Sequence, residues 1–231
     1  MKNTKEQQEK SGPITTGFEN AGENQFPPGW EGMNNINVQK YQGKKWIAMT
    51  KDGYWYPRQF NKEIKDGFSL SFDVSRNKDV SYYSGLFTIT PGEIPYDNAG
   101  EGYRPDKSRR MFKSLYDSYA GGFNRVALWF DPHWNSGGQL TVYTYNISET
   151  VKFKPQIPLP EFFKDKNKHQ LTIRRKGNGL PVMDNGKTIA DLPGVFISTV
   201  RYNLYTFSKY KGNKQGEDGD VFYLKNINAV Y

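Results

Sequence analysis

The chain has 231 residues, 16% of them aromatic, with no cysteine and a formal net charge of +8. The lack of cysteine excludes disulfides, thiol catalysis and cysteine zinc sites, and no apolar stretch reaches the length of a membrane span. The charge comes without a helix-turn-helix, zinc-finger or RNA-binding signature, so we expect solubility or attraction to acidic glycans or anionic surfaces rather than nucleic-acid binding.

The beginning of the chain separates into a tail and the start of a folded domain. Residues 1–13 are polar and charged, predict a flexible tail and lack the hydrophobic segment of a signal peptide. Residues 14–231 have the size of one β-sandwich domain. Within them, 37–41 and 45–50 have the pattern of paired strands that are joined by a tight turn at Gly43.

The next part of the chain contains one well-patterned strand and one long insertion. Apolar and polar side chains alternate along residues 67–76, which predicts a half-buried strand, and a second strand is expected at 82–90. Residues 91–122 are too polar and irregular for a core element and predict a long loop insertion. Loops of this length are usually functional or disordered.

Residues 124–131 and 139–146 predict two strands that are joined by a polar loop. In the first strand Val126, Leu128 and Phe130 share one face, which we assign to the core. Four large side chains of the two strands face the other way: Arg125, Trp129, Tyr143 and Tyr145.

The remaining sequence predicts further strands with short turns. Pro155, Pro158 and Pro160 predict a connecting loop, and Asn185-Gly186 is typical of a type I′ hairpin turn. Strands are expected at 169–175, 180–184, 187–191, 202–208 and 221–230. About a dozen strands with almost no helical periodicity predict an all-β fold, an antiparallel two-sheet sandwich.

Several short motifs follow one another in a recognisable order: Ser84 to Pro91, Gly121-Gly122-Phe123, Val126 to Asn135, His169 to Arg174, and Val221 to Ile227. In this order they resemble the concanavalin A-like lectin/glucanase superfamily, which includes legume-type lectins, laminin-G-like modules and glycosidases. The opening Phe18-Glu19-Asn20 is similar to laminin-G-like modules in exported proteins of Bacteroidetes-type bacteria. The resemblance implies a jelly roll over 14–231 and an exported or cell-surface protein whose signal sequence is absent from this chain.

The resemblance also bears on metal binding. Trp129 stands where the lectins have an acidic ligand of a transition metal, so that site is expected to be lost. Ca²⁺ takes six to eight oxygens, whereas Asp131, the His133 carbonyl and Asn135 supply about three. Asp131 and Asn135 are therefore the candidate ligands of a Ca²⁺ site too poor in oxygens to bind tightly. Alternatively, both side chains only cap the turn.

The sugar site implied by the resemblance is incomplete. Gly122, His133 and Asn135 match sugar contacts of the lectins by position, whereas Ser84 replaces the family's sugar-binding aspartate. From the residues themselves, the better platform for a sugar is the ring-rich face with Arg125, Trp129, Tyr143 and Tyr145. Tyr205 and Phe207 are expected to continue it. The alternative is that the insertion folds over these rings and makes them a second small core.

Catalytic chemistry has little support in the sequence. A glycosidase needs two facing carboxylates, and no strand has the acidic pattern of the superfamily's glucanases. The remaining acidic residues are interpreted as solvated loop charges, with a loop cation site as the alternative: Glu93, Asp97, Glu101, Glu217, Asp218 and Asp220. His169 is expected to pack beside Leu171 and Ile173 at a strand end.

These patterns lead to one functional hypothesis and two alternatives. The sequence favours a non-catalytic, lectin-like carbohydrate-binding module that binds a glycan or polysaccharide on the concave sheet and the adjacent loop rim. The first alternative is a protein-interaction or structural module of a cell-envelope assembly. The second is a divergent glycoside hydrolase, which would need a carboxylate pair across the concave sheet.

Overall fold

The computed structural model describes residues 12–77, 86–93, 124–131, 138–146, 149–159, 162, 167–210 and 220–231. Nearly all of the expected tail and the insertion from residue 94 to 122 lie outside these residues. In the described part of the chain, no helix is long and apolar enough to cross a membrane.

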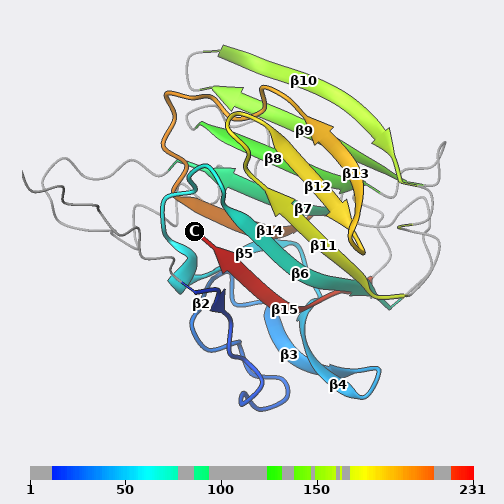
Figure 1. The fold of residues 1–231 in the computed structure, drawn as a ribbon. Helices are drawn as coiled ribbons and strands as arrows, with labels where there is room; N and C mark the ends of the chain where they lie inside the picture. The colour runs from blue at the N-terminus through cyan, green and yellow to red at the C-terminus, as the bar shows by residue number, and fades with distance from the viewer. Residues whose placement is uncertain are drawn as a thin grey trace, which may run out of the picture.

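Fifteen strands in the described residues form two antiparallel sheets that face each other (Figure 1). Sheet A has the order β13-β12-β11-β6-β15-β4-β3, with β1 paired to β15. Its strands are β1 (Ile14–Thr15), β3 (Ile36–Tyr41), β4 (Lys44–Met49), β6 (Ser69–Arg76), β11 (His169–Arg174), β12 (Leu180–Asp184), β13 (Lys187–Leu192) and β15 (Phe222–Val230).

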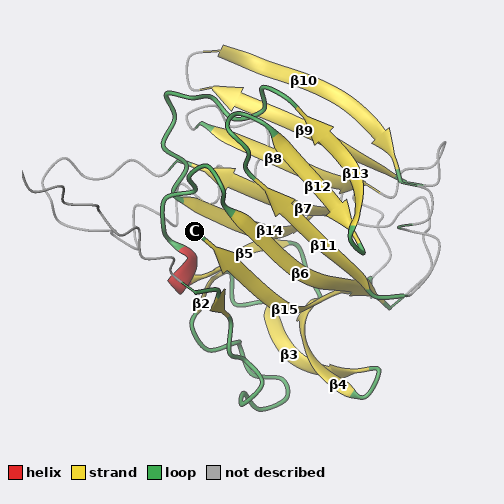
Figure 2. Ribbon diagram, viewed as in Figure 1, coloured by secondary structure: helices red, strands yellow, loops and turns green. Residues whose placement is uncertain are grey.

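Sheet B has the order β10-β9-β8-β7-β14-β5-β2. Its strands are β2 (Trp30–Gly32), β5 (Gly53–Pro57), β7 (Leu86–Gly92), β8 (Arg125–Asp131), β9 (Gln139–Asn146), β10 (Glu149–Pro158) and β14 (Leu204–Tyr210). The helical part of the described chain is the single 3₁₀ turn at Arg58–Phe60, which stands out among strands and loops in Figure 2. The predicted all-β, two-sheet sandwich is confirmed.

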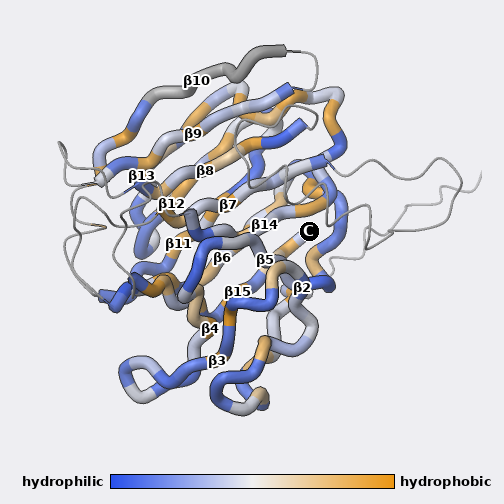
Figure 3. The backbone as a smooth tube through the Cα atoms, turned by 180° about the vertical axis from the view of Figure 1, so that it is seen from behind, coloured by the Kyte–Doolittle hydropathy of each residue, from blue (hydrophilic) through white to orange (hydrophobic). Residues whose placement is uncertain are grey.

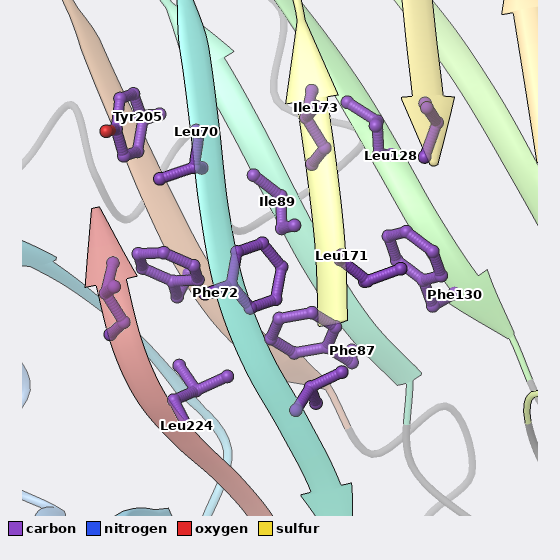
Figure 4. Packing of buried hydrophobic residues seen from close by; sticks show 14 of the residues in the cluster. Leu70, Phe72, Phe87, Ile89, Leu128, Phe130, Leu171, Ile173, Tyr205 and Leu224 are labelled. Atoms are coloured by element: carbon purple, nitrogen blue, oxygen red, sulfur yellow. The ribbon is translucent and has the colours of Figure 1, made fainter. Parts of the chain in front are cut away.

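The core lies between the two sheets and is centred on aromatic rings (Figure 4). Phe87 of β7 is fully buried, and its ring centroid lies 5.9 Å from that of Phe72 and 5.6 Å from that of Phe222, both on sheet A. Within sheet B it also packs against Phe130 and Phe207. Burying such rings removes large apolar areas from water, and this hydrophobic effect is the main contribution to the stability of a β-sandwich.

Two hairpin turns form where short sequence signals predict them. Asn185 and Gly186 have φ of 48° and 80°, the left-handed conformation that a type I′ turn requires, between β12 and β13. Gln42 and Gly43, with φ of 46° and 76°, join β3 and β4 in the same way.

The loop predicted from Pro155, Pro158 and Pro160 is wrong in part, because most of it is strand β10, the edge of sheet B. The pairing of β10 with β9 shifts register between Phe153 and Gln156, and the strand ends at Pro158. Proline lacks the N–H that a central strand needs, but it is tolerated at bulges and edges. Pro155 and Pro158 therefore mark the edge position of this strand, and Pro160 lies outside the described residues.

A buried charge cluster joins the sheets at the end of the sandwich where β14 stops. Arg76 of β6 pairs with Asp220 at 3.1 Å, and both side chains are less than 10% exposed. Lys209 of β14 donates to the backbone carbonyls of Asp220 and of Thr50, the latter at 3.3 Å. Asp220, expected to be a solvated loop charge, is thus part of the interior.

Replacing the buried carboxylate tests this cluster. Asp220→Asn removes the negative charge and leaves the Arg76 guanidinium buried, so the free energy of unfolding should fall by about 3 kcal/mol. The matched control is Glu63→Gln, because its pair with Arg201 (3.1 Å) is partly exposed to water, and its loss should change stability by less than about 1 kcal/mol. Urea denaturation compares the two; equal losses would contradict the assigned role of the cluster.

Because of Tyr205, the free energy of unfolding is expected to depend on pH in the alkaline range. Burial raises the pKa of Tyr205 well above its usual value, and the neighbouring Tyr231 adds to the rise. The unfolded chain therefore loses this proton near pH 10, before the folded chain does. The contribution of Tyr205 is complete below that pH and falls by up to about 1.4 kcal/mol per pH unit above it.

We expect Tyr205→Phe to lose less stability than the wild type between about pH 10 and 11.5, as measured by urea denaturation across that range. Tyr210→Phe removes the same hydroxyl from an exposed ring and is the control for the loss of a phenol group. Parallel curves for the wild type and Tyr205→Phe would refute the assignment.

Candidate functional site

The strands β8 and β9 place the predicted residues on the outer face of sheet B. Opposite pairs in the register are Trp129 with Thr141, Ala127 with Tyr143, and Arg125 with Tyr145. The intervening residues of β8 face inward and belong to the core, and Figure 3 shows hydrophobic segments within both β8 and β9. The prediction that Arg125, Trp129, Tyr143 and Tyr145 share the face away from the core is confirmed.

The four side chains touch one another in a continuous row, which we call the ring row. The ring centroids of Trp129 and Tyr143 are 4.8 Å apart, and those of Tyr143 and Tyr145 are 6.1 Å apart. The guanidinium carbon of Arg125 lies 3.9 Å from the centre of the Tyr145 ring. These spacings are within the range of favourable ring–ring and cation–π contacts.

Exposure differs between the two ends of the ring row. Arg125 is 1% exposed and Tyr145 is 9% exposed, whereas Trp129 and Tyr143 are half-buried. Burial lowers the pKa of Arg125, an effect that the adjacent Tyr145 opposes. The accessible end of the ring row is therefore formed by Trp129 and Tyr143. Arg125 packs against the Tyr145 ring at the buried end.

Beside the ring row, the outer face of sheet B is lined by small hydroxyl side chains. In the register, Thr90 lies opposite Thr206 and Thr88 lies opposite Ser208. All of the following are at most 7% exposed: Thr88, Thr90, Thr141, Thr206 and Ser208. Whether the insertion covers this face lies outside the described residues.

A second pair of rings on this face was missed by the sequence reasoning. Tyr54 and Tyr56 of β5 flank the core residue Trp55 and point the other way. Tyr56 donates its hydroxyl to Glu31 of β2, which also accepts a hydrogen bond of 2.6 Å from Nε of Arg58. The alternation around Trp55 is visible in the sequence, but only the strand order puts β5 in the same sheet as β8.

The candidate metal site is represented by one described residue. Asp131 ends β8 opposite Gln139 and is half-buried, whereas His133, Asn135 and Gly122 lie outside the described residues. No group of three His, Cys, Asp or Glu side chains gathers elsewhere in the described chain. Since Ca²⁺ takes six to eight oxygens, the described residues do not by themselves fit a calcium site.

Two sequence expectations about neighbouring residues are wrong. Tyr205 and Phe207 do not continue the ring row, because they face inward and are fully buried in the core. Glu93 is not a solvated charge, because its carboxylate accepts hydrogen bonds from the Asn124 side chain at 2.6 Å and from the Arg201 backbone at 3.3 Å. Both differences follow from the order of the strands in the sheets, which the sequence pattern alone does not determine.

His169 occupies the packing position expected for it. It is 8% exposed, and its ring lies 4.5 Å from that of Phe162. Its Nδ1 is 2.9 Å from the Asp184 carboxylate of the neighbouring strand. This pair joins β11 to β12 on sheet A and is not part of the outer face of sheet B.

Among the described side chains on the outer face of sheet B, the carboxylates are Glu31 on β2 and Asp131 on β8. Four strand steps separate β2 from β8, which is about 19 Å at the usual strand spacing. Retaining and inverting glycosidases hold their carboxylates about 5–5.5 and 6.5–9.5 Å apart. These two residues therefore do not form a glycosidase pair.

The contact between Arg125 and Tyr145 can be isolated by a double-mutant cycle. We expect Arg125→Met and Tyr145→Leu to show a coupling energy of about 1–2 kcal/mol in urea denaturation, because the guanidinium is desolvated over the ring. Strictly additive effects would mean that this contact does not hold the buried end of the ring row.

No protein-family model and no curated protein matches the sequence, but solved structures match the fold. The VIP36 exoplasmic/lumenal domain, solved with Ca²⁺ and Man3GlcNAc, aligns with a TM-score of 0.59 and 12% identity over 94% of this chain and 87% of that chain. A glycoside hydrolase family 16 endo-glucanase from Bacteroides ovatus aligns with a TM-score of 0.60 and 10% identity over 90% and 97%.

The Emp47p carbohydrate recognition domain aligns with a TM-score of 0.57 and 12% identity over 92% of each chain. Identities this low indicate a shared fold and leave the function open. The fold implied by the sequence motifs is confirmed: the chain has the jelly-roll fold of these structures.

Proposed function

We propose that this protein is a non-catalytic, lectin-like carbohydrate-binding module, and that a glycan binds on the outer face of sheet B. The observation that carries the proposal is the contact pair Trp129–Tyr143, whose half-buried rings lie 4.8 Å apart at the accessible end of the ring row. Flat rings with polar neighbours are the usual platform for the apolar face of a sugar.

The polar partners of the glycan would come from the rim beside these rings. Asp131 and Gln139 end β8 and begin β9 and are both half-buried, so they are accessible to sugar hydroxyls. We further propose that His133, Asn135 and Gly122 complete the rim, as the sequence motifs imply. Arg125 and Tyr145 support the platform from its buried end.

The fold relatives support this choice and suggest a setting. The VIP36 domain has a bound oligosaccharide, and the Emp47p domain is a carbohydrate recognition domain. The VIP36 domain is exoplasmic or lumenal, and we propose that this chain likewise acts outside the cytoplasm, as part of an exported or surface protein.

In the part of the chain that the structure describes, no observation supports the alternative of a protein-interaction module. Large hydrophobic side chains that are exposed in the described residues are Met33, Tyr210 and Val230. They come from a loop after β2, from sheet B and from sheet A, so they do not make the contiguous apolar patch that marks protein interfaces.

The proposal is tested by removing the accessible tryptophan. Trp129→Ala should lower affinity for a polysaccharide by at least about tenfold, because a stacked ring contributes on the order of 1.4 kcal/mol, while the melting temperature stays within a few degrees. Met33→Ala, an exposed side chain elsewhere, is the matched control and should bind as the wild type does.

The measurement is a panel of immobilised neutral and acidic polysaccharides, run in calcium and in EDTA. Binding that survives EDTA supports the ring platform, and binding lost in EDTA would add a metal that the rim loop helps to hold. Unchanged binding by Trp129→Ala, or no binding by the folded wild type, would refute the proposed site.

A further inference from the structure

Basic side chains gather at the end of the sandwich where β6 begins and β11 ends, two strands that lie side by side in Figure 1. Three segments meet there, 61–68, 174–179 and 201–203, and together they contain six Lys or Arg residues and two carboxylates. The backbone N–H of Ile64 donates to the carbonyl of Tyr202 at 2.7 Å and joins two of the segments. Five of the six cations are exposed, and we call them the basic end: Lys62, Lys65, Arg174, Lys176 and Arg201.

The sixth cation, Arg175, points inward and holds the segments together. Its carbonyl accepts a hydrogen bond of 3.0 Å from the N–H of Gly67. Its guanidinium carbon lies 5.0 Å from the centre of the Phe196 ring, and its Nη1 donates to the carbonyl of Ile64 at 2.5 Å. Because side chains alternate along an extended chain, the two basic neighbours of Arg175 point away from the core. The exposed cations are therefore arranged around an interior arginine, and ordering them for a ligand costs less conformational entropy.

The positive charge of the basic end is only partly compensated. Oε2 of Glu63 lies 3.1 Å from Nε of Arg201 and 4.0 Å from Nζ of Lys65. The two cations share this oxygen and are at most about 7 Å apart, a distance at which like charges repel each other. Asp66 accepts a hydrogen bond of 2.7 Å from the backbone N–H of Gly177. Since the side chains of Lys65 and Arg201 are 69% and 57% exposed, the net positive field reaches the solvent.

Few apolar groups accompany these cations. Among the described residues, the exposed large hydrophobic side chain of this region is Val230. It pairs with Ser69, which pairs on its other side with Arg174. One exposed apolar side chain is ordinary for a protein surface, and contacts with proteins or membranes need a larger apolar patch.

The aromatic rings beside the basic end are not open to a ligand either. Phe196 and Tyr202 are at most 3% exposed, and the ammonium of Lys62 lies over the Tyr231 ring, 5.8 Å from its centre. Proteins that bind single-stranded nucleic acids stack the bases on aromatic side chains. The chemistry that remains is that of ammonium and guanidinium groups, which bind carboxylates and other oxyanions by charge-assisted hydrogen bonds.

We propose that the basic end is a second binding surface, and that its ligand is an acidic polysaccharide held through its carboxylate or sulfate groups. This inference goes beyond the proposed function. The platform of Trp129 and Tyr143 on sheet B contacts the apolar face of a sugar, whereas the basic end recognises negative charge. Arg174 and Lys176 belong to the β11 side of sheet A, so the two surfaces lie on different sheets.

The test measures binding to immobilised dextran sulfate and polygalacturonate, with neutral dextran beside them, at about 50 and 300 mM NaCl. The wild type should bind both acidic polymers, and more weakly at the higher salt concentration. The double variant Lys65→Gln/Lys176→Gln should lower affinity for both by roughly 3- to 10-fold. Its melting temperature and its behaviour toward neutral dextran should be those of the wild type.

The matched control is Lys40→Gln/Lys44→Gln, which changes the net charge equally and should bind the acidic polymers as the wild type does. Both lysines are exposed on the hairpin of β3 and β4. The hydroxyl of Tyr41 in that hairpin donates to the carbonyl of Arg76, at the far end of β6, whose eight residues span about 23 Å.

Equal weakening by the two double variants would mean that only the net charge matters, and it would overturn this inference. So would no binding of the acidic polymers, or tighter binding to phosphatidylglycerol vesicles or to a single-stranded oligonucleotide than to either polymer. Trp129→Ala should leave binding of the acidic polymers unchanged, and its loss there would also overturn the inference. Binding of neutral polysaccharides tests the ring row, and salt-sensitive binding of acidic ones tests the basic end, so each proposal can fail alone.

Discussion

The packing of Phe87 between the sheets is the constraint on which the rest of the structure depends. Its ring touches Phe72 and Phe222 across the core and Phe130 and Phe207 on the flanking strands. Close-packed interiors admit few alternative arrangements, and a shift of one residue would turn every side chain of β7 to the other face. The inner rings thereby fix which residues of β8 and β14 face outward.

The orientation of the residues on the outer face of sheet B follows from this core. The surface of that face differs from the usual outer face of an antiparallel sheet. An outer face of an antiparallel sheet is normally polar and wet, yet here small hydroxyl residues lie buried beside a row of touching rings. The buried end of that row is a desolvated guanidinium stacked on Tyr145. Rings that are already held in place lose little conformational entropy when a ligand arrives, which is the usual origin of preorganised binding.

The sequence predicted those features, such as strand faces and turns, that depend on residues close together in the chain. The alternation in β8 and β9 identified the face of Trp129 and Tyr143, and the Asn185-Gly186 pair identified its turn. Pattern alone did not reveal the inward orientation of Phe207 or the edge strand β10, because both follow from strand order and from partners distant in the sequence.

The proposed recognition at the described part of this face does not depend on the charge of the chain. The cation of the ring row, Arg125, is 1% exposed and stacks on a ring, and the carboxylates Glu31 and Asp131 lie on strands four steps apart. An electrostatic field from exposed charges would speed the encounter with acidic ligands, and it would weaken as the salt concentration rises. Contacts between rings and the apolar face of a sugar depend instead on shape and buried area, so the proposed site should discriminate between glycans by their stereochemistry rather than by their charge.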